Sequence, residues 1–216
     1  MRRIGHWTPR YIFNRARNWA YEKRNMDKPW ITSEANSLLS TLLLPTDRGV
    51  EWGSGRSTKW FAGKIRHLTS IEDNADWHAI VTKQLADAGT QNVDYFYRPI
   101  DRATNPADSE YVRACAAFTD ESLGFALVDG ELRDQCALTV LAKISPGGLL
   151  VIDNAHWFLD HATHSPASRY GKGPLNETWA AVQSQLRGWR MIWTSNGVSD
   201  TAIWVKPQVG KPDSSS

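Results

Sequence analysis

Residues 50–58 read Val-Glu-Trp-Gly-Ser-Gly-Arg-Ser-Thr, an apolar strand end that runs into a glycine-rich turn and then a helix start. Gly53 and Gly55 lack a Cβ, so the backbone can turn tightly there and lie close against a ligand. Ser57 or Thr58 is expected to cap the following helix, whose first amides then point at whatever occupies the turn. This stretch therefore predicts a cofactor site.

The segments after the turn alternate between strand and helix patterns. Apolar runs such as Leu149-Leu-Val-Ile-Asp-Asn suit strands that are covered on both faces of a parallel sheet. The expected strands are 49–52, 67–72, 93–100, 125–130 and 149–154, and the expected helices are 58–65, 75–88, 108–119, 132–144 and 175–187. The alternation predicts a doubly wound α/β sheet with helices on both faces.

The last two strand patterns, 189–194 and 201–205, are separated by Ser195-Asn-Gly-Val-Ser-Asp. So short a link can only form a hairpin, which adds one antiparallel strand to the parallel sheet. The predicted fold class is thus a Rossmann-like α/β sheet, mostly parallel, with one antiparallel strand.

Length and composition are those of a single soluble domain. The chain has 216 residues, of which 41% are hydrophobic and 22% are charged, and its longest apolar runs are strand-sized. The N-terminus is basic but lacks the apolar stretch of a signal peptide, so we expect a cytoplasmic protein with no membrane partner. Cys115 and Cys136 fall in helix-like segments, which is neither a disulfide framework nor a metal-binding spacing.

Four regions are expected along the chain. Residues 1–44 form an N-terminal helical arm, residues 45–207 form the core, residues 156–174 form a lid loop within it, and residues 208–216 form a disordered tail. The first 30 residues contain eight basic side chains and two acidic ones. This arm could meet an anionic partner or present a solvated helix face, and no nucleic-acid motif accompanies it.

Glycine turns of this kind occur in several nucleotide-binding families. A dinucleotide fingerprint requires a third glycine where this chain has Thr58, and a phosphate loop requires a Gly-Lys-Ser or Gly-Lys-Thr that is absent. Glu51 precedes the turn, and its carboxylate suits an amine or hydroxyls better than a bare phosphate. Glu72 follows at about the spacing at which an acidic side chain reaches ribose hydroxyls.

Four motifs in order resemble those of class I S-adenosylmethionine (SAM)-dependent methyltransferases. They are Glu51-Trp-Gly-Ser-Gly-Arg-Ser, Ser70-Ile-Glu72, Leu127-Val-Asp129-Gly and Ser145-Pro-Gly-Gly-Leu-Leu-Val-Ile-Asp153. The resemblance covers roughly residues 45–207. The Trp-rich N-terminal region and the glycine turn are also similar to the actinobacterial sugar O-methyltransferases of methylmannose polysaccharide synthesis.

The resemblance implies positions for the parts of the cofactor. The turn would lie along the methionine part with Glu51 near its amino group, and Glu72 would accept from both ribose hydroxyls. Asp101 would lie near the adenine edge, although a helix cap before Asn105-Pro is an equal alternative. The implied cofactor-binding residues are Glu51, Trp52, Gly53, Ser54, Gly55, Ser57, Glu72, Asp101 and Asp129.

The acceptor chemistry is expected at the carboxyl ends of the strands. Asp129, Asp153 and Asn154 should converge there, with His156 close behind. Methyl transfer to an alcohol needs a group that takes the hydroxyl proton, and histidine titrates near neutrality. We therefore expect His156 to act as general base, held by a neighbouring carboxylate, with Asp153 and Asp129 as the other catalytic residues. A histidine that merely hydrogen-bonds the loop is the alternative.

A metal-dependent mechanism would use the same strand ends. Asp129, Asp153 and Asn154 resemble the ligands of Mg²⁺ in catechol and caffeoyl-CoA type O-methyltransferases, in which the ion lowers the pKa of the acceptor hydroxyl. The chain departs from those families at Gly130-Glu-Leu-Arg133, which lacks their further acidic or lysine neighbours.

Aromatic and basic residues suggest a polar, ring-shaped acceptor. Motifs for methylation of exocyclic amines or of cytosine C5 are absent, so the expected acceptor is a carbohydrate hydroxyl first and a phenol or natural-product hydroxyl second. A nicotinamide-dependent oxidoreductase is a distant alternative, and a homodimer is the expected assembly. The candidate acceptor-binding residues are Trp30, Arg133, Trp157, Arg169 and Tyr170.

Overall fold

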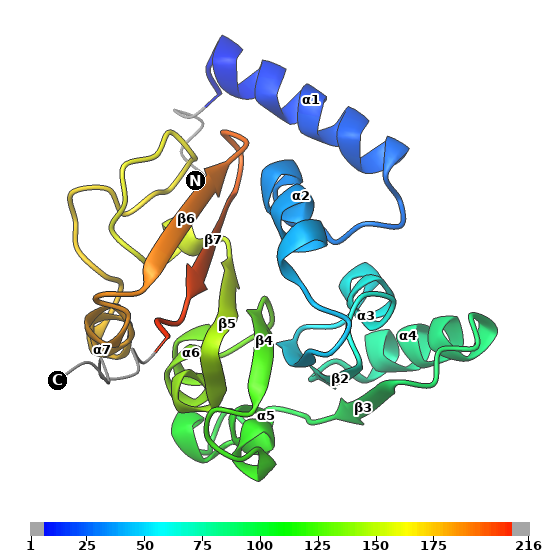
Figure 1. Cartoon of the computed structure of the whole chain (residues 1–216). Helices are drawn as coiled ribbons and strands as arrows, with labels where there is room; N and C mark the ends of the chain where they lie inside the picture. The colour runs from blue at the N-terminus through cyan, green and yellow to red at the C-terminus, as the bar shows by residue number, and fades with distance from the viewer. Residues whose placement is uncertain (1–6, 209–216) are drawn as a thin grey trace, which may run out of the picture.

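The computed structural model describes residues 7–208, which form a seven-stranded sheet with helices on both faces (Figure 1). The strand order is β3-β2-β1-β4-β5-β7-β6. The strands are β1 Arg48–Trp52, β2 His67–Glu72, β3 Val93–Tyr97, β4 Leu123–Val128, β5 Ile144–Asp153, β6 Arg190–Ser195 and β7 Asp200–Val205. The predicted fold class is confirmed. The predicted disordered tail lies, apart from Gln208, outside the described residues.

The strand order changes direction at β1. The chain runs outward from β1 to β2 and β3, then returns to place β4 on the other side of β1, and all of these pairings are parallel. β5 continues the parallel sheet beside β4. Ligands of open α/β sheets bind at such a switch point, outside the carboxyl ends of the strands. The glycine turn follows β1 directly and therefore lies at this point.

The C-terminal hairpin closes the other edge of the sheet. β7 pairs antiparallel with both β5 and β6, and Asp153 at the end of β5 faces Thr201 at the start of β7. The predicted antiparallel strand is thus β7. Because it runs opposite to its neighbour, its first residues lie beside the last residues of β5.

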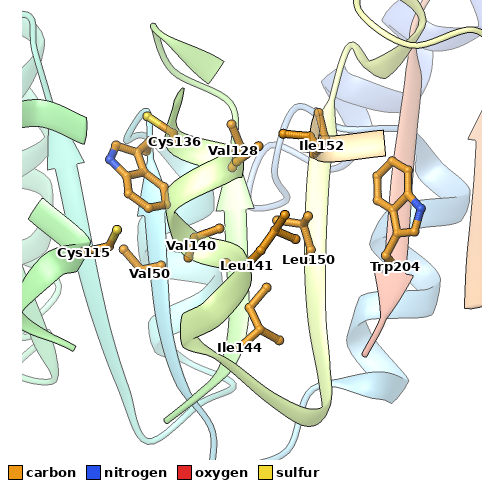
Figure 2. Close-up of a cluster of buried hydrophobic side chains, with 14 of the residues drawn as sticks. Val50, Cys115, Val128, Cys136, Val140, Leu141, Ile144, Leu150, Ile152 and Trp204 are labelled. Atoms are coloured by element: carbon orange, nitrogen blue, oxygen red, sulfur yellow. The ribbon is translucent and has the colours of Figure 1, made fainter. Parts of the chain in front are cut away.

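Most of the buried side chains form two clusters, one on each face of the sheet. Figure 2 shows part of one cluster, in which Cys136 and Val140 lie over the strand residues Val128 and Leu150. Both cysteines are buried and unpaired, so they serve as core residues. On the other face, Leu39 and Phe61 pack with strand residues in the second cluster. Burial on both faces explains why β4 and the second half of β5 are almost wholly apolar.

The helices largely match the expected segments. They are α1 Pro9–Arg24, α2 Ser33–Leu42, α3 Arg56–Ala62, α4 Ala75–Asp87, α5 Glu110–Arg113, α6 Arg133–Val140 and α7 Glu177–Gln185, with 3₁₀ turns η1 Pro106–Asp108, η2 Ala114–Ala117, η3 Leu141–Lys143 and η4 Ala155–Trp157. The helix expected over 108–119 is wrong as a single element. Asn105 and Ser109 each accept a hydrogen bond from the amide two residues ahead, so each side chain starts a separate short turn.

The expected cap of α3 is also wrong. The helix begins at Arg56 with Gly55 as its N-cap, which places Ser57 and Thr58 inside the first turn. The φ of Gly55 is 153°, a conformation that L side chains rarely adopt. Gly55 is therefore the N-cap residue. The Thr58 hydroxyl does not cap the helix and instead makes hydrogen bonds to the Gly55 amide and to Glu51.

The two N-terminal helices differ in their relation to the core. Ala35 and Leu39 of α2 are fully buried, and the Thr32 amide donates to Thr201 Oγ1 at 3.1 Å. α1 lies outside α2 and the hairpin at the edge of the molecule (Figure 1), and no residue of this fully described helix is buried. Within residues 7–208, none of the helices combines the length and the apolar character that a bilayer crossing requires.

Candidate functional site

The glycine turn is packed against the end of β4. Gly53 has a φ of 87°, and a Cβ built there would lie 2.8 Å from the amide nitrogen of Gly130. Gly130 in turn approaches the hydroxyl of Tyr111, which would lie 1.9 Å from an added Cβ. The two backbones touch because neither glycine has a side chain. The backbone conformation and the close contact at position 53 therefore require glycine. The sequence motif did not predict that Gly130 packs against this turn.

Glu51 lies beneath the turn and braces it. It is fully buried and accepts hydrogen bonds from the hydroxyls of Thr58 and Ser70, the latter at 2.7 Å. Thr58 Oγ1 also accepts from the Gly55 amide at 3.0 Å. Burial raises the pKa of Glu51 to about 7. The threonine that replaces a third glycine thus ties the turn to the carboxylate.

One oxygen of Glu51 has no hydrogen-bond partner among residues 7–208. Oε2 is buried and makes no hydrogen bond with any described residue. A buried carboxylate oxygen without a donor is costly, so it favours a ligand that brings one.

Glu72 closes the other side of the turn. Its Oε2 accepts from the amide and hydroxyl of Ser54 at 3.0 and 2.7 Å, and its Oε1 accepts from the amides of the next two residues. The Ser54 hydroxyl also bonds the Tyr95 hydroxyl at 2.6 Å, and the Trp77 indole donates to the Ser54 carbonyl at 2.8 Å. Tyr95 and Trp77 are site residues that sequence reasoning missed. The one sequence signal for Trp77 was the presence of an aromatic residue in the first turn of the helix that follows β2.

Three of the predicted strand-end residues converge on Arg133. Its Nη2 lies 3.0 Å from Asp129 Oδ1 and donates to the Asp129 carbonyl at 2.6 Å. Its Nη1 donates to the Asp153 carbonyl at 2.6 Å and to Asn154 Oδ1 at 3.1 Å. Leu132 adopts a left-handed φ of 46° just before α6, and Arg133 then begins the helix beside the strand ends. The expected convergence therefore has a guanidinium at its centre.

These contacts do not fit a bound Mg²⁺. The Asp129 carboxylate and the Asn154 side-chain oxygen already accept from a permanent cation, and the Asp153 side chain accepts from Thr201 Oγ1 at 2.6 Å. No group of three or more acidic, histidine or cysteine side chains in the described part of the chain could hold a metal ion. The proposed set of Asp129, Asp153 and Asn154 is therefore a poor metal site.

The two aspartates differ in exposure and in pKa. The Asp129 side chain is 30% exposed, and burial raises its pKa to about 6 against the opposing effect of Arg133. Asp153 is 3% exposed, and burial together with the nearby Asp129 raises its pKa to about 8. Asp129 is thus the more acidic and the more exposed of the two carboxyl groups, whereas Asp153 is enclosed and has the more strongly raised pKa.

The structure contradicts the expected support of His156 by a neighbouring carboxylate. The ring is fully buried, and neither nitrogen has a hydrogen-bond partner among the described residues. Asp153 bonds Thr201 instead, and Asp200 accepts from Ser165 and Trp193. The backbone carbonyl of His156 accepts from the Arg169 amide at 3.0 Å, which ties the first residue of the segment expected to form a lid (156–174) to a residue near its end. Burial lowers the pKa of His156.

Solved structures share this architecture at low sequence identity. A putative methyltransferase from Streptococcus mutans, in complex with SAH, is 10% identical with a TM-score of 0.54, covering 80% of this chain and 96% of its own. An rRNA methylase from Streptococcus thermophilus is 12% identical with a TM-score of 0.53, covering 81% and 95%. The chain shares the mostly parallel α/β fold of these proteins. No protein-family model and no curated protein sequence matches it.

This shared fold does not by itself name the reaction. Precorrin 8w decarboxylase from Methanobacterium thermoautotrophicum is 19% identical with a TM-score of 0.53, covering 85% of this chain and 95% of its own. One architecture thus occurs in proteins named for different reactions, so the reaction has to be argued from the site.

Two residues of the predicted cofactor set have other contacts within the protein. Trp52 is fully buried, and its indole donates to the Tyr111 carbonyl at 2.8 Å, so it belongs to the core. Asp101 is exposed and accepts from the Ala103 amide and the Thr104 hydroxyl. It holds a local turn, and Asn105 takes the capping role that was its alternative. Ser57 remains beside Glu51 in the first turn of α3.

The predicted acceptor residues separate into two groups. Arg133 and Trp157 line one cavity of about 320 Å³ together with Gly130, Glu131, Leu132, Asp134, Phe158, Leu175, Asn176 and Trp179. Arg169 instead donates to the Gly173 carbonyl within the lid, and Tyr170 is exposed. Trp30 lies under the Arg56 guanidinium, 4.7 Å from the ring centroid. Only the first pair therefore shares a cavity.

A larger cavity of about 790 Å³ opens beside Gly55 and Arg56 and is lined further by residues of α3 and α4. Neither Asp129 nor Asp153 lines either of the two cavities. The smaller cavity is the one linked to Asp129, because Arg133 lines this cavity and its Nη2 lies 3.0 Å from Asp129 Oδ1.

Proposed function

We propose that the chain is a SAM-dependent O-methyltransferase whose acceptor is a hydroxyl of a small polar molecule, a carbohydrate before a phenol. The observation that carries this proposal is the glycine turn at the end of β1, with Glu51 beneath it and Glu72 beside it. The shared fold supports the same cofactor position, since ligands of open α/β sheets bind at the switch point.

The residues of the turn fit the cofactor. The orphaned Glu51 Oε2 is a suitable acceptor for its amino group, and the backbone of Gly53 and Gly55 gives a surface without side chains. Glu72 is the acceptor for ribose hydroxyls, which would displace the Ser54 hydroxyl from its Oε2. SAM, when bound, supplies a methyl group carried on a positively charged sulfur. The Trp77 indole donates to the Ser54 carbonyl. We therefore assign Trp77, and not Asp101, to the cofactor-binding residues beside the turn.

Asp129 is the general base in this proposal. It stands at the end of β4, next to Gly130 and thus to the glycine turn, and its side chain is partly exposed. With a pKa of about 6 it is ionised at neutral pH and can take the acceptor hydroxyl proton as the new C–O bond forms. Arg133 orients the carboxylate. His156 is assigned a structural role in the lid, because its ring nitrogens are enclosed.

The acceptor class rests on the cavity beside Arg133. Its walls include the aromatic rings of Trp157, Phe158 and Trp179, with polar groups from Arg133, Asp134 and Asn176 at the same surface. Aromatic faces with interspersed hydrogen-bonding groups suit a sugar ring, whose C–H faces are apolar and whose hydroxyls are not. The similarity to sugar O-methyltransferases favours the same order of acceptors.

Calorimetry followed by turnover tests the proposal. Titration with S-adenosylhomocysteine and separately with NADH should show binding of the first alone, and binding of NADH alone would refute the cofactor assignment. Transfer of a labelled methyl group is then measured with a panel of glycosides and phenols. Binding of S-adenosylhomocysteine with turnover of phenols but of no glycoside would retain the cofactor and overturn the carbohydrate assignment.

A further inference from the structure

Helix α1 contacts the rest of the protein through a polar strip. Asn14, Asn18 and Tyr21 are half-buried and recur at helical spacing on one side of the helix. The Asn18 side chain accepts from Asn196 Nδ2 at 2.9 Å, and Asn14 lies so close to Gly197 that an added Cβ would be 2.2 Å from its amide nitrogen. The inward side of α1 thus carries two amides that contact the hairpin, together with the half-buried phenol of Tyr21.

The outward side of α1 is apolar. Ile12, Phe13 and Trp19 are 52%, 66% and 57% exposed, and Ala16 between them is exposed as well. Ile12, Ala16 and Trp19 follow one another at spacings of four and three residues, which places them on one strip of the helix. A helix of a globular protein normally turns such a strip toward the core. In α1 the orientation is reversed, so the apolar strip is available to a partner.

Basic residues flank this strip. α1 carries five basic side chains and one acidic side chain. By helical spacing Arg17 lies beside Phe13 on one flank and Arg15 beside Trp19 on the other. Lys23 Nζ lies over the Trp19 ring at 4.1 Å from its centroid. Any partner must therefore accept aromatic rings and several positive charges together.

We propose that this face of α1 binds the surface of an anionic lipid bilayer. Aromatic and aliphatic side chains enter the boundary between headgroups and acyl chains, while arginine and lysine contact the anionic headgroups. A second copy of the chain is a poorer occupant, because two identical basic faces repel each other. A helix that lies on a bilayer surface does not need the length to span the bilayer. The proposal therefore replaces the expectation of no membrane partner with peripheral attachment of the protein through α1.

Co-sedimentation of the full-length protein with vesicles tests the proposal. Binding is expected with vesicles of phosphatidylcholine and phosphatidylglycerol, and it should weaken with salt and be much weaker with phosphatidylcholine alone. The double variant Phe13→Gln, Trp19→Gln should bind roughly tenfold more weakly or worse. Replacing Arg15 and Arg17 by Gln should weaken binding about fivefold per arginine.

Ile80→Gln is the matched control, because Ile80 is 47% exposed on α4. This variant should keep full vesicle binding, and all variants should keep their circular dichroism spectra and melting temperatures. Equal binding by wild type and the Phe13, Trp19 double variant would overturn the proposal. So would a wild-type dimer, measured by light scattering, that dissociates in the double variant without any vesicle binding. Neither readout needs methyl transfer, so the proposed function can fail independently.

Discussion

The Arg133 guanidinium donates to the backbone carbonyl of Asp153 at 2.6 Å while its other terminal nitrogen lies 3.0 Å from the carboxylate of Asp129. One side chain thus joins the carboxyl ends of β4 and β5. It supplies a positive charge at the place where related chemistry can use a metal ion. This link determines the geometry on which the first two predictions depend.

Arg133→Ala should lower the free energy of unfolding by about 3 kcal/mol. The substitution leaves the backbone carbonyls and the carboxylate that now accept from the guanidinium without a donor. Urea denaturation measures this change. Lys83→Ala is the control, since Lys83 pairs with Asp87 on the surface of α4, and it should change stability by less than about 0.5 kcal/mol. Equal effects of the two substitutions would contradict the role given to Arg133.

Methyl transfer should be independent of divalent metal. Activity is expected to survive dialysis against a chelator, and electron paramagnetic resonance should detect no Mn²⁺ bound by the apoprotein. The physical reason is that Arg133 already contacts the Asp129 carboxylate and the Asn154 side-chain oxygen, while the Asp153 carboxylate accepts from Thr201. Loss of activity in chelator that is restored by Mg²⁺ would show this interpretation to be wrong.

Gly53→Ala should destabilise the protein by roughly 2 kcal/mol or more and weaken binding of S-adenosylhomocysteine. Its φ is positive, and the new methyl would collide with the Gly130 backbone. Gly89→Ala is the matched control. Gly89 also has a positive φ, of 63°, but a methyl group added there would lie in open space. That control should cost about 1 kcal/mol and leave ligand binding intact. Similar losses in both would argue against the close contact.

Stability should fall as the pH rises from about 4 to about 8. The folded pKa of Asp153 is raised to about 8, while in the unfolded chain it ionises near pH 4, so the folded state holds a proton that the unfolded state releases. Glu51 and Asp129, also raised, act in the same direction. Asp153→Asn should therefore flatten the decline in melting temperature with pH. An unchanged slope would mean that Asp153 is ionised in the native protein.

Asp129→Asn should lower kcat about 10²-fold or more while S-adenosylhomocysteine still binds. The wild-type rate should rise with pH through an apparent pKa of about 6 as the carboxylate ionises. His156→Gln is the comparison and should change kcat far less. A large loss confined to the His156 variant would restore histidine as the base.

Local patterns in the chain predicted the fold and the approximate place of the site. Alternating apolar runs define the strands, Gly53 and Gly55 define the turn, and acidic residues at strand ends mark the crevice. These features are readable because they depend on short-range periodicity and on backbone conformations that only certain residues tolerate. The expected cap of α3 failed because Gly55 itself adopted the N-cap conformation.

The sequence by itself thus determined a doubly wound sheet with a glycine turn at its switch point, because local residue patterns specify strands, helices and turns. Only the tertiary structure decided that Arg133 joins the strand ends, that His156 is enclosed, and that α1 turns its apolar strip outward. Each of these depends on how distant segments meet in space. A side chain's partners and exposure follow from packing, which no single stretch of sequence contains.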